Sequence, residues 1–171
     1  MLTLHRLSLS YRLLYSFVLL FMTAGTAAHS VHQELRAGLA PREVAAWYRG
    51  NEEQPDAAVF LFPKSFEEVF EDVWEALTTY TLALLIFGGI LMRSDTAPKM
   101  RAGLVGGYAL GGLLAAAAPL LVRYVTAGFA PLLTAVLFAL PALALAMSVV
   151  GAREIWFRRT AGPRIDPARK V

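Results

Sequence analysis

The chain has 171 residues, of which 57% are hydrophobic and 17% are charged, and its formal net charge is +3. A soluble domain averages roughly 45–50% apolar and about 25% charged residues, so this composition is typical of a membrane protein. The chain contains no cysteine, which excludes disulfides, thiolate nucleophiles and iron–sulfur ligation. At this length we expect a single integral membrane domain over residues 1–171.

Acidic and basic residues gather in different parts of the chain. Residues 30–75 hold ten acids and four bases, a net charge of −6, and the remainder holds twelve bases and three acids, a net charge of +9. Such alternation is typical of membrane topology and differs from the basic face that binds nucleic acid. We therefore expect the lipid bilayer, and either other membrane subunits or further copies of the chain, as partners, and no nucleic acid.

Four apolar stretches are long enough to cross a membrane, which takes about 20 residues of helix. The predicted spans cover residues 11–30, 73–92, 102–122 and 127–151. Lys and Arg flank the first span, the link between the second and third, and the end of the fourth. The positive-inside rule then predicts an all-α protein of the bacterial inner membrane with both termini in the cytoplasm. Residues 30–72 would be periplasmic, and residues 153–171 would form a cytoplasmic tail.

The first span has a second interpretation. Residues 1–28 have a basic start, an apolar core and small residues before His29, which is typical of a secretory signal peptide. Cleavage at that position would leave three spans, whereas a retained anchor gives four. Both interpretations give the same orientation for the rest of the chain, and both stay open here.

The segment between the first two spans carries two helix signals. Pro41 predicts the start of a short helix on the membrane surface, and Gly50 predicts its end. Ser65 followed by Glu68 forms a capping-box pattern. This pattern predicts a second helix that begins outside the membrane and continues into the second span.

The start of this second helix is strongly acidic. Glu67, Glu71 and Glu75 recur at helical spacing, and Glu68 and Asp72 widen the predicted acidic face. Like charges in a row destabilise a helix unless water, cations or a basic partner neutralise them. We therefore expect either a solvated surface or a docking surface for a basic partner protein or for cations.

The third span carries Gly103, Gly107 and Gly111 at four-residue intervals. Helices in lipid associate through close backbone contact, which such a glycine ridge permits. The ridge predicts tight packing against either the fourth span or a neighbouring subunit. The fourth span is rich in Leu and Ala and has no ionisable group, and we expect it to face lipid.

Two histidines are the candidate metal ligands. His29 and His32 stand three residues apart at the outer end of the first span, and imidazole is a common ligand of metals and haem. We expect them to be two polar residues at the headgroup level with no cofactor, and the alternative is a haem or copper site. Residues 76–92, 102–122 and 124–152 contain no Asp, Glu, Lys, Arg or His, which counts against a proton-coupled transporter or pump. The chain has no nucleotide-binding or hydrolase motif, and we expect no enzymatic activity.

Two elements of the outer segment carry a family resemblance. Residues 38–52 read GLAPREVAAWYRGNE, and residues 62–68 read FPKSFEE. They resemble a poorly characterised group of small bacterial inner-membrane proteins with GL-P--V--YY-G-E and FPKSF-EL elements before the second span. Members of this group carry an HxH pair at the start of that span, which implies haem or metal. The matching positions here are Trp74 and Ala76, so the resemblance implies no site residue in this chain.

Three observations together favour one function: the uncharged cores of the inner spans, the glycine ridge and the organised outer segment. We expect a structural or accessory subunit, or an assembly factor, of a larger inner-membrane complex. The first alternative is a haem- or metal-binding, redox-associated protein that uses His29 and His32. The second is an oligomeric channel or transporter for small solutes.

Overall fold

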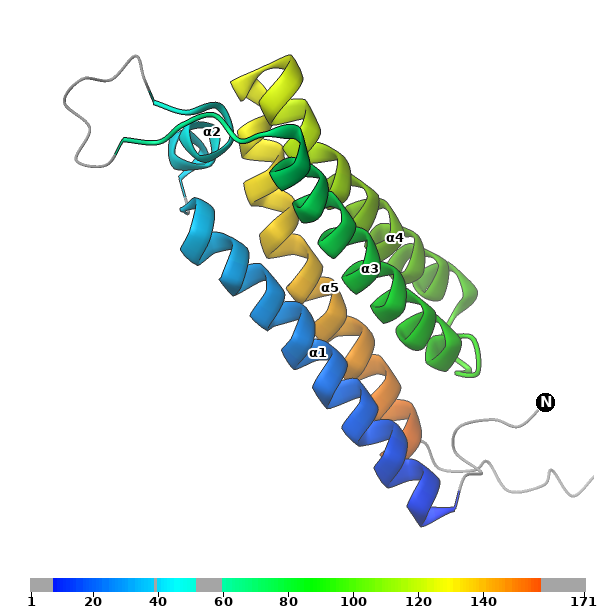
Figure 1. The fold of residues 1–171 in the computed structure, drawn as a ribbon. Coiled ribbons are helices and arrows are strands. Elements are labelled where there is room, and N and C mark those ends of the chain that lie inside the picture. The colour runs from blue at the N-terminus through cyan, green and yellow to red at the C-terminus, as the bar shows by residue number, and fades with distance from the viewer. Residues whose placement is uncertain (1–7, 39, 52–59, 158–171) are drawn as a thin grey trace, which may run out of the picture.

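The fold is a bundle of four long helices with a short helix across one end (Figure 1). The computed structural model describes residues 8–38, 40–51 and 60–157. Its α-helices are α1 (Leu9–Ala37), α2 (Pro41–Arg49), α3 (Phe66–Leu91), α4 (Pro98–Leu120) and α5 (Ala130–Trp156). No strand occurs in these described ranges.

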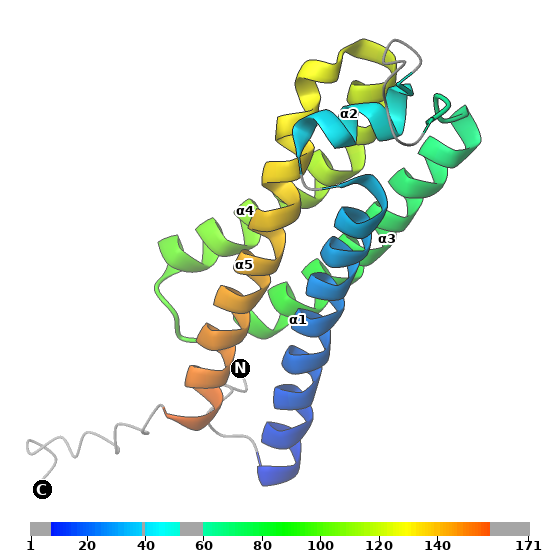
Figure 2. The ribbon, with the colours of Figure 1, turned by 90° about the vertical axis from the view of Figure 1, so that its left-hand side faces the viewer.

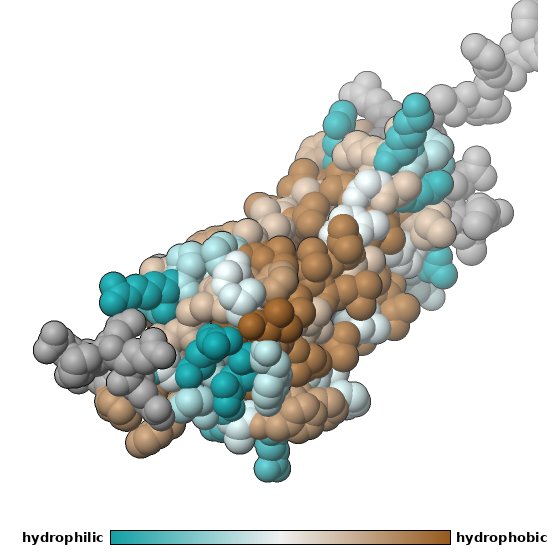
Figure 3. All heavy atoms as spheres, turned by 90° about the horizontal axis from the view of Figure 1, so that it is seen from above, coloured by the Kyte–Doolittle hydropathy of each residue, from teal (hydrophilic) through white to brown (hydrophobic). Residues whose placement is uncertain are grey.

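Helices α1, α3, α4 and α5 are long and apolar enough to cross a membrane, which confirms the predicted all-α membrane fold with four spans. On the face seen in Figure 3, apolar side chains occupy the middle of the molecule, with hydrophilic residues towards its two ends. A bilayer requires such an apolar surface, because hydrocarbon cannot solvate polar groups.

Two of the helices extend well beyond the predicted spans on the side of α2. Helix α1 continues past residue 30 to Ala37, and α3 begins at Phe66, directly after Ser65, which confirms the helix start predicted by the capping-box pattern. The signal-peptide cleavage position before His29 therefore lies inside a continuous 29-residue helix. Each extension adds length beyond the roughly 20 residues that hydrocarbon requires, so both helices reach out of the bilayer.

Helix α5 is the central element of the bundle and contacts α1, α2, α3 and α4. Leu140, Ala144 and Met147 are fully buried. The expectation that this span faces lipid therefore holds for only part of its surface, where Phe138, Leu145 and Val149 are exposed. Leu and Ala fit both lipid and a protein interior, so an apolar sequence does not distinguish the two surroundings.

The glycines of α4 contact two different helices. A Cβ atom placed on Gly111 would lie 2.9 Å from Leu140 of α5, and one on Gly107 would lie 3.8 Å from Leu143. A Cβ atom on Gly112 would lie 3.0 Å from Cβ of Tyr80 in α3, whereas one on Gly103 would meet nothing within 4 Å. For Gly107 and Gly111, the packing partner of the glycine ridge is therefore α5 of the same chain.

Helix α2 lies across the end of the bundle (Figure 1). It begins with Pro41 at its first turn and is followed by Gly50, which confirms the short helix and the bounds that the sequence predicts. Gly50 has φ 83°, a conformation that favours glycine at a helix end. Val44 and Tyr48 are buried against Val69 and neighbouring apolar residues, so α2 is packed onto the bundle.

Beyond α4, the chain passes through one π-helical turn, Leu121–Val125, and a short 3₁₀ turn, Ala127–Phe129, before α5. A π-helical turn is wider than an α-helical turn and is frequent at functional sites. Here the turn lies beside α2. It brings Arg123 to the same end of the bundle as α2.

The contrast between Gly112 and Gly103 gives a matched pair of variants. Gly112→Ala should lower the free energy of unfolding by about 1–3 kcal/mol, because the new methyl group crowds the Tyr80 Cβ. Gly103→Ala should change it by less than about 1 kcal/mol, since the site is open and Ala favours helix. Thermal unfolding in detergent measures both values. Equal losses would contradict the packing described here.

Candidate functional site

A buried ion pair lies between α2 and the start of α3. Nζ of Lys64, in the extended segment before α3, is 2.6 Å from Oδ2 of Asp72. The two side chains are only 8% and 5% exposed. Taking two charges out of water costs several kcal/mol per ion, so each depends on the other for compensation.

Aromatic rings and a second base surround this pair. Nζ of Lys64 lies 4.9 Å from the ring centroid of Trp47 and 5.0 Å from that of Tyr48, both in α2. These distances are within the range of cation–π attraction. Arg36 of α1 lies 3.9 Å from the other carboxylate oxygen of Asp72. Side chains from α1, α2, α3 and the extended segment thus meet at one carboxylate.

Tyr48 stays a neutral phenol in these surroundings. Burial, together with the neighbouring Asp72 carboxylate, raises the pKa of Tyr48 far above its ordinary value. Both causes act against a second negative charge at this place. The Tyr48 ring therefore offers Lys64 an apolar surface and the electron-rich face of an aromatic ring, and it adds no negative charge.

Backbone contacts hold Lys64 from both sides. Its N–H donates to the carbonyl of Tyr48 at 3.1 Å, and its carbonyl accepts from Nε of Arg123 at 2.8 Å. Arg49 of α2 donates to the carbonyls of Val122 and Arg123, at 3.3 and 3.4 Å, in the π-helical turn. The extended segment and α2 are therefore joined to each other and to the π-helical turn. We call the extended segment and α2 together the cap (residues 40–51 and 60–65).

The side chain of His29, which belongs to α1, lies between α1 and α3. Its Nδ1 is 3.3 Å from Oε1 of Glu75, and its ring meets the edge of the Tyr80 ring at a centroid distance of 5.3 Å. The His29 side chain is 8% exposed and that of Glu75 is 44% exposed. The pair thus links the first two spans near the end of the bundle.

A small cavity of about 20 Å³ lies among these groups, lined by Gln33, Tyr48, Asp72, Tyr80 and other residues of the bundle. This volume admits a guest of about the size of one water molecule. Buried hydroxyl groups lie nearby: Tyr80 OH and Ser30 Oγ have no hydrogen-bond partner within the described chain. The cavity is far too small for a haem.

The two predicted histidine ligands lie in different surroundings. His29 is turned towards Glu75, whereas His32 is exposed. Within the part of the chain that the structure describes, no three His, Asp or Glu side chains come together in a group that could hold a metal ion. Two histidines three residues apart in the sequence do not specify where a third metal ligand would come from.

The acidic start of α3 divides into two faces. Glu67 and Glu71 are exposed, as expected, and Glu75 pairs with His29. The expectation that Asp72 shares their face is wrong. Asp72 lies on the stripe of α3 that faces the bundle, between the buried residues Val69 and Ala76, and its carboxylate pairs with Lys64.

The sequence interpretation missed Lys64, Asp72, Arg36 and Trp47 as one cluster. Lys64 was visible in the FPKSF element of the family resemblance, and it is the only base between α2 and α3. Its partner stands eight residues further along, on another element. No local pattern identifies that pairing.

A comparison with protein-family models places the chain. A model of a transmembrane helical domain matches residues 38–162, which include α2 to α5. The chain belongs to this transmembrane helical domain family. The match begins directly after α1, so it covers the cap with Lys64, Asp72 and Trp47 of the cluster, and it leaves out Arg36. No curated protein and no solved structure matches the chain.

The ion pair gives the first prediction for this site. Asp72→Asn should lower the free energy of unfolding by about 3–5 kcal/mol, because Lys64 stays buried beside a neutral amide. Glu67→Gln is the matched control and should change it by less than about 0.5 kcal/mol, since Glu67 is exposed. Thermal unfolding in detergent reports both. An Asp72→Asn protein as stable as the control would contradict the role given to the pair.

The double variant Asp72→Asn/Lys64→Met separates loss of the pair from loss of packing. Replacing both partners removes the uncompensated charge, so this protein should be more stable than Asp72→Asn alone. If the two losses of stability simply add, the side chains do not compensate each other.

The start of α3 gives a prediction about pH. Oε2 of Glu68 accepts from the N–H and hydroxyl of Ser65, at 2.7 and 2.8 Å, and these bonds lower the pKa of Glu68. A lowered pKa contributes stability above the ordinary pKa of Glu, and this stability is lost as the pH falls through the lowered value. The Tm difference between the wild type and Glu68→Gln should therefore shrink from pH ~7 to pH ~3. A constant difference would contradict this.

Proposed function

We propose that this protein is an accessory subunit or assembly factor of a larger complex in the bacterial inner membrane, and that it has no catalytic activity of its own. The observation that carries the proposal is an aromatic and acidic face on α3. Phe66, Phe70 and Trp74 are all exposed and recur every four residues. Glu67 and Glu71 form an exposed acidic stripe beside them.

The length of α3 supports the position of this face. Its 26 residues span about 39 Å, whereas the hydrocarbon core is about 30 Å thick. About six residues at the Phe66 end then extend beyond the hydrocarbon. Phe66 and Phe70, whose ring centroids lie 6.0 Å apart, would meet the headgroup layer and the partner there. Aromatic side chains are enriched at the centres of protein interfaces.

The cap supports the proposal because it holds this face in a fixed position. The Lys64–Asp72 pair fastens the start of α3 to the extended segment, and the bond from Nε of Arg123 to the Lys64 carbonyl fastens that segment to the π-helical turn. A rigid surface loses little conformational entropy when a partner binds. The exposed acids would select a basic partner surface and steer its approach.

The orientation belongs to this proposal. The cap would lie in the periplasm and the opposite end, with Arg93, Lys99 and Arg101, in the cytoplasm. We infer that α1 is a retained anchor. In its support, the helix continues through the predicted cleavage position, and Thr23 Oγ1 lies 2.6 Å from Ser148 Oγ of α5.

The two alternatives from sequence have less support. A metal or haem site would use His29 and His32, which lie in different surroundings. A solute pathway would use the hydroxyl groups between the helices. Thr23 and Thr26, however, also donate to the carbonyls of Leu19 and Met22 in their own helix. Hydroxyls with such partners satisfy themselves within the bundle.

Site-specific photocrosslinking in native membranes tests the proposal. A benzophenone amino acid at Phe70 or Trp74 should give a discrete adduct, because both side chains lie on the proposed interface. The same group at Leu85, which is equally exposed but lies deeper along α3, should give none. An adduct at twice the chain's 18.6 kDa would indicate a homo-oligomer in place of a different partner.

Charge reversal provides the control for specificity. Glu67→Lys/Glu71→Lys should reduce the adduct at Phe70 several-fold, because like charges would then face the basic partner. If neither Phe70 nor Trp74 gives an adduct, or if charge reversal leaves its yield unchanged, the proposed interface is wrong.

A further inference from the structure

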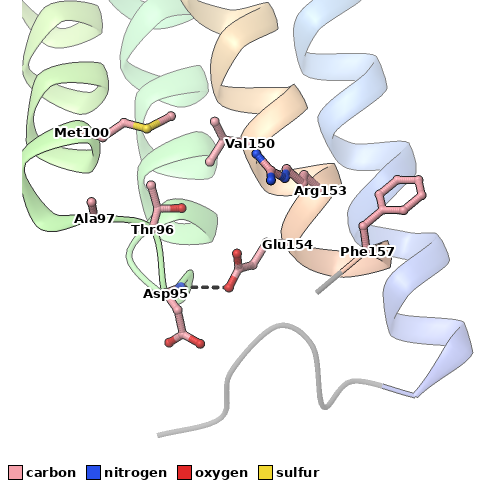
Figure 4. Close-up of a pocket in the computed structure, with 8 residues that line it drawn as sticks. All are labelled: Asp95, Thr96, Ala97, Met100, Val150, Arg153, Glu154 and Phe157. Carbon is pink, nitrogen blue, oxygen red and sulfur yellow. Dashed lines mark hydrogen bonds between the residues drawn. The ribbon is translucent and has the colours of Figure 1, made fainter. Parts of the chain in front are cut away.

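Two cavities lie towards opposite ends of the bundle. The larger, of about 580 Å³, is open and lies between the start of α4 and the end of α5 (Figure 4). Its buried acid, Glu154, accepts the N–H of Asp95 at 3.0 Å, and both residues hold further interactions. The smaller, of about 20 Å³, is lined by all five α-helices of the described chain, including α2 where it crosses the other end of the bundle (Figure 2). We call this smaller one the interior cavity.

The interior cavity is surrounded by polar side chains that are cut off from solvent. Tyr80 of α3 and Gln33 of α1 line it, and they are 2% and 7% exposed. Ser30, which is 3% exposed, stands three residues before Gln33 on α1. Within the part of the chain that the structure describes, neither the Tyr80 hydroxyl nor the Ser30 hydroxyl has a hydrogen-bond partner. Nearly all buried polar groups in proteins are satisfied by protein or by ordered water, so these two hydroxyls indicate a bound ligand.

The missing partners are confined to the level of this cavity. One turn further along α1, Thr26 Oγ1 lies 3.3 Å from Tyr108 OH, so these hydroxyls bond directly across the helix contact. At the cavity, Ser30 is the side-chain neighbour of the Tyr80 hydroxyl, but the two hydroxyls are not in hydrogen-bond geometry. A small guest beside Tyr80 can therefore reach both of them.

We propose that the interior cavity binds one ordered water molecule, which joins the hydroxyls of Tyr80 and Ser30 and the amide of Gln33. The volume of the cavity admits one water, and buried waters make about three hydrogen bonds. Water both donates and accepts, as do all three of these side chains. An apolar guest would leave them unsatisfied. An ion would enter without a counter-charge, because the carboxylate of Asp72 in the lining already pairs with Lys64.

The water would fasten α1 to α3 near the cap. Ser30 and Gln33 belong to α1 and Tyr80 belongs to α3, so one molecule completes a contact that the side chains leave open. A water that bridges two buried groups is nearly as favourable as a direct hydrogen bond. This inference goes beyond the proposed function. It needs no partner protein, and it rests only on the part of that proposal in which α1 is retained.

Radiolytic hydroxyl labelling of the detergent-purified full chain tests the proposal. An X-ray pulse splits a bound water into hydroxyl radicals, which modify the side chain beside it even when bulk solvent cannot reach that side chain. Tyr80 should therefore be labelled several-fold faster than Phe87, a buried ring on the same helix that is outside the cavity lining. Equal rates would overturn the proposal.

The intact mass of the sample is measured first and separates two kinds of failure. A mass of 18.6 kDa shows that α1 is present, so that equal labelling rates then count against the water alone. A mass that lacks residues 1–28 would overturn the retained anchor and, with it, the site as drawn between α1 and α3.

The sign of a stability change distinguishes bound water from unpartnered hydroxyls. Ser30→Ala and Tyr80→Phe each remove one hydroxyl, and each should lower the Tm by about 2–4 °C, the scale of one hydrogen bond in a chain of this length. If the hydroxyls have no partner, removing them should raise the Tm, which would overturn the proposal. Thr134→Val is the control and should change the Tm little, because this hydroxyl donates to the Ala130 carbonyl of its own helix. A lower Tm without labelling of Tyr80 would indicate a direct bond between the two hydroxyls and would also overturn the water.

Filling the cavity locates the water. Ala76→Val adds two methyl groups at a lining position of α3, and Ala115→Val does the same from α4. In each variant that keeps the helical circular dichroism of the wild type, the labelling rate of Tyr80 should fall to that of Phe87, because the new side chain occupies the volume of the water. Labelling that persists in the filled variants would place the water elsewhere and overturn the site.

Discussion

The ion pair between Lys64 and Asp72 is the constraint on which the cap depends. Neither charge can remain in these buried positions without the other, because each would lose its hydration without compensation. The pair fixes the extended segment against α3, and the backbone of the same lysine joins α2 to the turn that carries Arg123. The cap is thereby an integral part of the bundle, with Val44 and Tyr48 buried beneath α2.

Within the bilayer, the structure relies on close contact rather than on charge. Helices in lipid gain little from the hydrophobic effect, so small residues that allow close approach supply the association. Gly112 meets Tyr80 between α4 and α3, and Gly151 of α5 meets Leu19 of α1. These contacts leave α5 in the centre, where it holds the α1 and α3–α4 sides of the bundle together (Figure 1).

The two ends of the bundle differ in how their charged groups are used. At the cap, charges are paired and buried, and the side chains that face outwards are aromatic and acidic. At the opposite end, α4 diverges from α5, and Arg153 lines an open cavity. The first arrangement suits contact with another protein, because it is rigid.

The sequence by itself determined the four spans, the surface helix that begins at Pro41 and the capped start of α3 at Ser65. These features arise from composition and from contacts between residues at most four positions apart. Only the tertiary structure decided that α5 is central and that Asp72 faces inward while Glu71 faces outward. An apolar side chain is compatible with lipid and with protein alike, and a carboxylate on a helix is buried only when a base on another element, here Lys64, compensates it.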